Sequence, residues 1–244
     1  MAQNIYDNPE FFEGYAKLNR SVNGLDGAPE WLSLARMLPN MNGLHVVDLG
    51  CGYGWFCREA QRQGAQQVTG LDISTKMLNK AREMTTNDQG ITYQQEDLEA
   101  LQLPTAAYDL VYSSLTLHYV ENLCALIKVV FHALKPGGNF VFSVEHPIYT
   151  APKEPSWLMD RSGNKSWPVN NYQAEGRRVT NWLAEGVVKQ HRLMATYLNL
   201  LVASGFVIVH VEEFGPTAEQ ILRNPALDEE KELPMLLLIS ARKP

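Results

Sequence analysis

Short apolar runs alternate with helix-length segments along most of the chain. The apolar runs predict strands over 44–49, 66–72, 91–95, 108–113 and 139–144. Between them, apolar residues recur at helical spacing, and Ser74 and Asn122 stand where they would cap two of the helices. Strands alternating with helices in this way indicate βαβ units and a parallel sheet.

The two ends of the chain extend this pattern. One N-terminal helix is expected to start at Asn8–Pro9 and a second at Pro29, because proline is favoured at the first helical position. Near the C-terminus the spacing predicts a helix over 191–204 and strands over 206–214 and 234–241. One exposed helix is expected between these last two strands.

Residues 147–190 interrupt the alternation of predicted strands and helices. This segment is rich in proline, glycine, tryptophan and tyrosine and shows no sustained period. So long a stretch without regular structure is expected in a compact domain only where it is functional or partly folded. We interpret it as a lid. It carries two more basic than acidic side chains, which hints at an anionic ligand.

Composition narrows the function classes. The chain has 244 residues with 45% hydrophobic and 20% charged residues, which is ordinary for a globular α/β domain. A net charge of −6 disfavours tight nucleic-acid binding. Three cysteines without a CxxC pair predict neither a disulfide framework nor a metal site, and indicate a cytoplasmic protein. The start does not resemble a secretory signal, and no apolar run is long enough to suggest membrane insertion.

A glycine-rich turn directly follows the first predicted strand. Asp48, Gly50, Gly52 and Gly54 lie in it, and glycines there let the backbone approach a ligand closely. Such a turn alone does not identify the ligand. The dinucleotide fingerprint would need a further glycine where Trp55 stands, which disfavours an NAD(P)-dependent oxidoreductase but leaves it as an alternative.

Acidic residues end the next two strands. Asp72 closes the second strand, where a carboxylate can accept hydrogen bonds from both ribose hydroxyls. Glu96 and Asp97 follow the third strand and could accept from an adenine amino group. Each alone could be a loop or cap residue. Together with the glycine turn, in order at the same sheet edge, they indicate a ligand with a nucleoside part.

With these features the chain resembles the class I S-adenosylmethionine-dependent methyltransferases. The resemblance rests on the motifs VVDLGCGYG, GLDIS, QEDLEALQLP, YDLVYSSLTLHYV and LKPGGNFVFS, within residues 44–144. It implies a doubly wound, seven-stranded, mostly parallel Rossmann-like sheet whose antiparallel last strand lies beside the fifth. It also implies S-adenosylmethionine as cofactor and S-adenosylhomocysteine as product. The pattern of these motifs is most similar to the small-molecule branch of the family, which includes quinone-biosynthesis methyltransferases.

The resemblance also implies a set of cofactor-binding residues. The glycines of the turn would wrap the methionine part, Asp72 would hold the ribose, and residues after the second and third strands would flank the adenine. N-terminal helices often cover the cofactor in this family. The expected set is Tyr15, Arg20, Asp48, Gly50, Gly52, Gly54, Asp72, Ile73, Met77, Asp97, Leu98 and Ser113.

We expect one methyltransferase domain over 1–244. Its expected parts are N-terminal cap helices (1–40), a cofactor-binding half (41–146), the lid insertion (147–190), and a C-terminal helix and strand pair (191–244).

The acceptor is expected to be a small molecule, methylated at oxygen, nitrogen or carbon. Many methyltransferases acting on bases carry a proline-rich motif after the fourth strand, whereas this chain has Tyr112–Leu115 without proline. His118, His146 and His191 are the candidate catalytic residues, with His146 nearest the acceptor because it follows the fifth strand. Methyl transfer needs alignment in a dry site more than a triad or metal. A cofactor-binding protein without activity remains an alternative, and we expect a monomer or homodimer.

Overall fold

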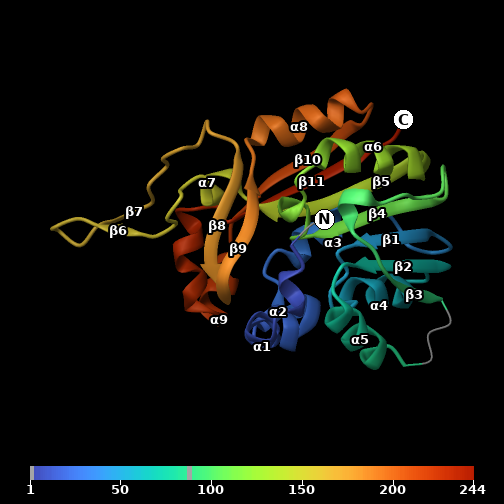
Figure 1. The fold of residues 1–244 in the computed structure, drawn as a ribbon, viewed down its shortest axis with the longest axis horizontal. Coiled ribbons are helices and arrows are strands. Elements are labelled where there is room, and N and C mark those ends of the chain that lie inside the picture. The colour runs from blue at the N-terminus through green and yellow to red at the C-terminus, as the bar shows by residue number, and fades with distance from the viewer. Residues whose placement is uncertain (1–2, 87–89) are drawn as a thin grey trace.

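A seven-stranded sheet forms the centre of the protein (Figure 1). The computed structural model describes residues 3–86 and 90–244. The sheet order is β10-β11-β5-β4-β1-β2-β3. The strands are β1 (His45–Leu49), β2 (Gln67–Asp72), β3 (Ile91–Gln95), β4 (Tyr108–Ser114), β5 (Leu134–Glu145), β10 (Val207–Phe214) and β11 (Leu236–Arg242). Neighbours from β3 to β5 are parallel, and β11 is antiparallel to both β5 and β10. This confirms the predicted Rossmann-like sheet with its antiparallel last strand.

Helices cover both faces of this sheet (Figure 1). Helices α6 (Leu123–Ala133) and α8 (Met194–Ala203) pack on one face, and α3 (Trp31–Met37), α4 (Trp55–Arg62) and α5 (Thr75–Met84) on the other. Helices α1 (Pro9–Ala16), α2 (Asn19–Val22) and α9 (Ala218–Arg223) lie away from the sheet (Figure 1). The side chains of Asn8, Ser74 and Asn122 accept the expected capping hydrogen bonds at α1, α5 and α6. The helix predicted from Pro29 begins two residues later, at Trp31.

Two apolar layers result from the alternation of side chains along the strands. Val47 and Leu49 of β1 pack in one cluster with residues of α6 and α8. Val46 faces the opposite side, in a second cluster with residues of α3 and α4. Because both faces are covered, the open edge at the carboxyl ends of the strands is where a ligand can enter.

The segment after β5 is more ordered than its composition suggests. It contains the short helix α7 (Pro147–Thr150), a small ribbon of β6 (Leu158–Met159) and β7 (Lys165–Ser166), and an antiparallel hairpin of β8 (Gly176–Trp182) and β9 (Ala184–His191). Apolar residues of β9 pack against N-terminal residues, among them Phe11 of α1. The helix expected over 191–204 starts only at Met194, so His191 ends a strand rather than beginning a helix.

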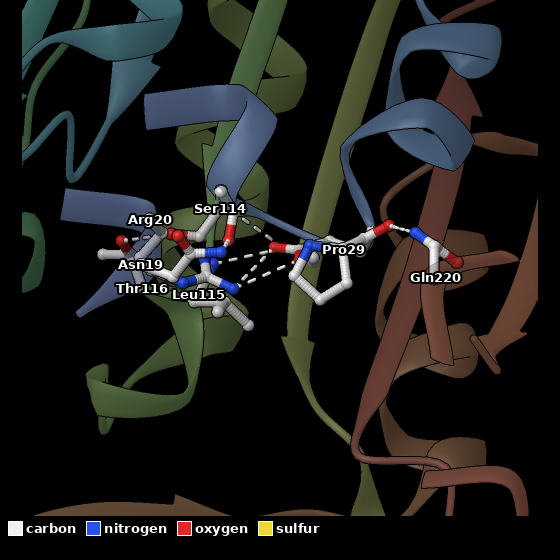
Figure 2. Close-up of polar contacts among 10 residues, drawn as sticks. Asn19, Arg20, Pro29, Ser114, Leu115, Thr116 and Gln220 are labelled. Carbon is white, nitrogen blue, oxygen red and sulfur yellow. Dashed lines mark hydrogen bonds and ion pairs between the residues drawn. The ribbon is translucent and has the colours of Figure 1, made fainter. Parts of the chain in front are cut away.

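Two helical pieces lie between the last two strands, where one exposed helix was expected. They are α9 and the 3-10 helix η5 (Pro225–Lys231). The side-chain amide of Gln220 in α9 donates to the carbonyl of Pro29 at 2.7 Å (Figure 2). The α9–η5 segment therefore contacts the residues that precede α3. Within the described ranges, no helix has the length and apolar character needed to cross a membrane.

Candidate active site

A cavity of about 830 Å³ opens at the carboxyl edge of the sheet. The turn after β1 and the ends of β2 and β3 line one part of it. Residues of the N-terminal segment, the end of β5, the β8–β9 hairpin and the α9–η5 segment line the rest. A cavity this size, formed at the edge where the parallel strands end, is a typical small-molecule site.

The glycine turn opens toward this cavity. Gly50 and Gly52 line it, and both have positive φ angles, 79° and 53°, which glycine adopts without strain. A Cβ placed on Gly52 would meet only the hydroxyl of Tyr15, at 3.9 Å. The backbone of Gly52 therefore leaves room for a bound group, as the cofactor's methionine part would require.

Asp72 is the best-placed carboxylate for the ribose. It ends β2, lines the cavity and is 8% exposed. Its two oxygens accept from the backbone N–H groups of Gly52 at 2.9 Å and Ser74 at 2.8 Å. These bonds fix the carboxylate between the turn and α5, while burial raises its pKa to about 6.

The raised pKa of Asp72 predicts a pH-dependent cofactor affinity. The ionised carboxylate would accept the ribose hydroxyls, so its protonation on acidification would oppose binding. We expect the affinity for S-adenosylhomocysteine to be constant at neutral pH and to fall about tenfold per pH unit below about pH 6. Calorimetry across this range measures it. Asp72→Asn should bind more weakly and lose this dependence; an unchanged slope in the variant would contradict the assignment.

Residues after β2 and β3 form the part of the cavity where the adenine is expected. Ile73, Asp97 and Leu98 line the cavity. Asp97 caps a 3-10 helix by accepting from the N–H of Glu99 at 3.0 Å, which places Leu98 over the cavity. An apolar side chain beside a carboxylate suits a flat ring with an amino group.

Four members of the expected cofactor set lie outside the cavity lining. The side chain of Asp48 is buried and accepts from the Cys57 thiol at 3.5 Å, and burial raises its pKa to about 8. The Ser113 hydroxyl donates to the carbonyl of Leu49 at 2.7 Å. A Cβ on Gly54 would lie 2.2 Å from the Tyr93 hydroxyl, and Met77 is 1% exposed. These four residues contact other protein groups rather than the cavity, so they can affect the site only by holding the residues that line it.

The N-terminal segment closes one side of the site. Tyr15 and Arg20 both line the cavity, as expected. The guanidinium of Arg20 is held by both oxygens of the buried Glu30, at 3.0 and 3.1 Å. Arg20 therefore faces the cavity as one half of an ion pair.

Of the three candidate catalytic histidines, only His118 lines the cavity. Its Nδ1 accepts from the backbone N–H of Glu145 at 3.4 Å. It is 2% exposed, and burial lowers its pKa to about 4, so the ring is neutral at neutral pH. With Nδ1 accepting, the ring proton lies on Nε2.

His146 and His191 are instead held within the protein. Nδ1 of His146 accepts from the N–H of Ile148 at 3.1 Å, capping α7, and its Nε2 lies 2.9 Å from a carboxylate oxygen of Glu213. His191 binds the Thr150 hydroxyl and the Tyr172 carbonyl, both at 2.8 Å. The expectation that His146 lies nearest the acceptor is thus corrected, since its ring is fully buried away from the cavity.

Several cavity residues were not singled out from the sequence. Glu145 takes the place expected for its neighbour His146, and Tyr6 and Tyr119 add two hydroxyls 3.5 Å apart. Trp182 and Tyr149 bring aromatic rings from the lid segment. The basic lid residues that suggested an anionic ligand do not line the cavity.

This fold and edge site define a Rossmann-like protein that binds a nucleoside-containing cofactor. A family model for a methyltransferase domain matches residues 47–142. The crystal structure of an S-adenosylmethionine-dependent methyltransferase from Mesorhizobium loti is 56% identical, with a TM-score of 0.87, covering 90% of this chain and 100% of that one. An uncharacterised Haemophilus influenzae protein is 32% identical over 98% of this chain and 96% of its own length. A malonyl-[acyl-carrier protein] O-methyltransferase of Erwinia pyrifoliae is 39% identical over 42% of this chain and 37% of that enzyme.

The chain belongs to the S-adenosylmethionine-dependent methyltransferases, as the class I motifs indicated. It is an enzyme that uses S-adenosylmethionine and releases S-adenosylhomocysteine. This excludes the oxidoreductase and the inactive binder considered from the sequence. The relatives described above do not single out the quinone-biosynthesis branch.

Proposed function

We propose that this enzyme methylates an oxygen, nitrogen or carbon atom of a free small molecule bound in the cavity. The observation that carries the proposal is the continuity of the cavity. One space joins the strand ends that suit the cofactor to an aromatic wall on the lid hairpin, where Trp182 lies. The net charge of −6 supports a small molecule over a nucleic acid.

The residues divide the work of the reaction between them. S-adenosylmethionine supplies a methyl group already activated by its sulfonium. Asp72 would hold the ribose, Asp97 and Leu98 the adenine, and the backbone of Gly50 and Gly52 the methionine part. The N-terminal segment and the lid hairpin would exclude water and orient the acceptor, which is the main contribution expected for an in-line displacement.

Screening with a labelled methyl donor tests this function. Purified protein is incubated with methyl-labelled S-adenosylmethionine and a fractionated metabolite extract, and the label is followed into small molecules. We expect a labelled product that depends on the enzyme and disappears with Asp72→Ala. In a parallel incubation with unfractionated cell extract, label that enters nucleic acid or protein but no small molecule would contradict the proposal.

We propose that residues 147–190 act as a lid over a single-domain enzyme. Side chains over 158–166 are largely exposed, whereas Val187 and Lys189 of the hairpin are buried. Protease cuts in the free protein should therefore fall within 153–175 and spare the hairpin. S-adenosylhomocysteine together with an acceptor should suppress them, as measured by mass spectrometry of timed digests. Equal cutting in both states would indicate a fixed insertion.

The protein is proposed to work in the cytoplasm as a monomer or homodimer. The three cysteines are free, with Cys51 and Cys57 buried and Cys124 exposed, which suits a reducing compartment. Sedimentation of the purified enzyme measures its assembly.

A further inference from the structure

Glu145 occupies the part of the cavity where the acceptor is expected. It is the last residue of β5, which pairs with β4 on the side away from β1 and the other cofactor strands. Its side chain lines the cavity and is 16% exposed. A carboxylate at this depth needs a defined partner, since burying a charge without one is costly.

That partner is Lys189 of β9, which lies behind the carboxylate. Its Nζ donates to Oε1 of Glu145 at 2.5 Å, and its own side chain is 6% exposed and does not line the cavity. In the part of the chain that the structure describes, no donor lies within hydrogen-bonding distance of Oε2. Glu145 therefore lines the cavity while Lys189 does not, and its Oε2 is left to accept a hydrogen bond from a ligand.

Two arginines line the cavity, and each lies beside a carboxylate. Arg20 is held by the buried Glu30, and Arg223, which is 76% exposed, pairs with Glu219 at the surface at 2.5 Å. Among the described residues, no lysine or arginine of the lining lacks a carboxylate partner. His118 is neutral. Among the described lining residues, the buried part of the cavity thus offers an anionic acceptor no cation without a carboxylate partner.

Aromatic rings complete the surroundings of Glu145. Trp182, Tyr119 and Tyr149 line the same cavity. The ammonium group of Lys189 already lies 5.0 Å from the centre of the Trp182 ring, within the range of a cation–π contact. Aromatic faces beside a carboxylate are the combination that proteins use to bind ammonium groups.

We propose that Glu145, positioned by Lys189, determines acceptor specificity and selects a small molecule that carries a protonated amine. This rests on the proposed function. The amine would donate to Oε2, and the aromatic wall would cover its carbon skeleton. A neutral hydroxyl could donate to the same oxygen, but a hydrogen bond between two charged groups is roughly twice as strong as one between neutral groups.

Binding of three matched probes tests this proposal without requiring turnover. The protein is saturated with S-adenosylhomocysteine and titrated calorimetrically with benzylamine, benzyl alcohol and benzoate, which share one ring. We expect benzylamine to bind about tenfold or more tightly than either other probe. Glu145→Gln should remove this preference, and Glu145→Asp should keep most of it.

Glu83→Gln is the matched control, because Glu83 is an exposed carboxylate of α5 outside the cavity lining and outside the proposed lid. It should leave all three affinities unchanged. Benzylamine binding no tighter than benzoate or benzyl alcohol, or a preference that survives in Glu145→Gln with S-adenosylhomocysteine still bound, would overturn the proposal. Failure of the wild-type protein to bind S-adenosylhomocysteine would instead refute the proposed cofactor site.

Discussion

Replacing Asp72 with alanine should weaken the binding of S-adenosylmethionine and S-adenosylhomocysteine about ten- to hundredfold. A hydrogen bond to a charged group is worth about 1.5–3 kcal/mol, and Asp72 is placed to make such bonds with the ribose hydroxyls. The change also removes the acceptor for the N–H groups of Gly52 and Ser74, which fix the glycine turn. Calorimetric titration with S-adenosylhomocysteine measures the loss.

Glu83→Ala serves as the control for Asp72→Ala. Glu83 lies on α5, close to Asp72 in sequence, but its side chain is 66% exposed and pairs with Lys80 on the surface. Its removal should leave affinity unchanged, because exposed pairs contribute little. Wild-type affinity in a folded Asp72→Ala protein would mean that the ribose is held elsewhere.

The central sheet could be predicted because its signals are local. The central strands β1 and β4 and the second half of β5 contain short apolar runs, and the capping residues Ser74 and Asn122 mark helix starts within one turn of where they act. The glycine turn and Asp72 follow strand ends that the same runs define. Such features depend on neighbours in sequence, so no tertiary information was needed to find them.

The β8–β9 hairpin was not predicted because its buried positions are not all apolar. Buried and less buried side chains alternate along β9, but apolar and polar residues do not. Along β9 the buried positions include Val187, Lys189 and His191. Two of these three are polar, and each is satisfied by a partner distant in sequence: Glu145 for Lys189, and Thr150 and Tyr172 for His191. An apolar–polar pattern of period two therefore does not appear in the sequence, although the strand has an inner face.

Strand parity explains why Glu145 lines the cavity and its neighbour His146 does not. Phe140, Phe142 and Val144 of β5 face the cluster that contains α6 and α8. Because side chains alternate along a strand, Glu145 faces the other way, and it reaches the cavity. The alternation of phenylalanines in this strand was the signal that could have separated the two residues.

His146→Ala should lower the free energy of unfolding by about 2 kcal/mol while leaving kcat unchanged. The change removes the cap of α7 and the contact with Glu213, and a lost cap alone costs about 0.5–2 kcal/mol. Denaturant unfolding measures this loss. His210→Ala is the control: His210 is 53% exposed beside Glu212, so its loss should change stability by less than about 0.5 kcal/mol. A lower kcat in folded His146→Ala would restore His146 as a catalytic candidate.

Unlike His146→Ala, His118→Ala should lower kcat, by about 10²-fold, while the affinity for S-adenosylhomocysteine stays unchanged. The ring fixes the backbone of Glu145 through Nδ1 and leaves its Nε2–H as a donor at the cavity, so its loss misplaces the acceptor, and such misplacement can cost about 10²-fold. Turnover is measured with an acceptor found by the labelled-donor screen. Because burial holds the pKa of His118 near 4, the wild-type pH profile should show no imidazole titration between about pH 6 and 8. A titration there that His118→Ala abolishes would mean that the ring exchanges a proton during turnover rather than orienting the acceptor.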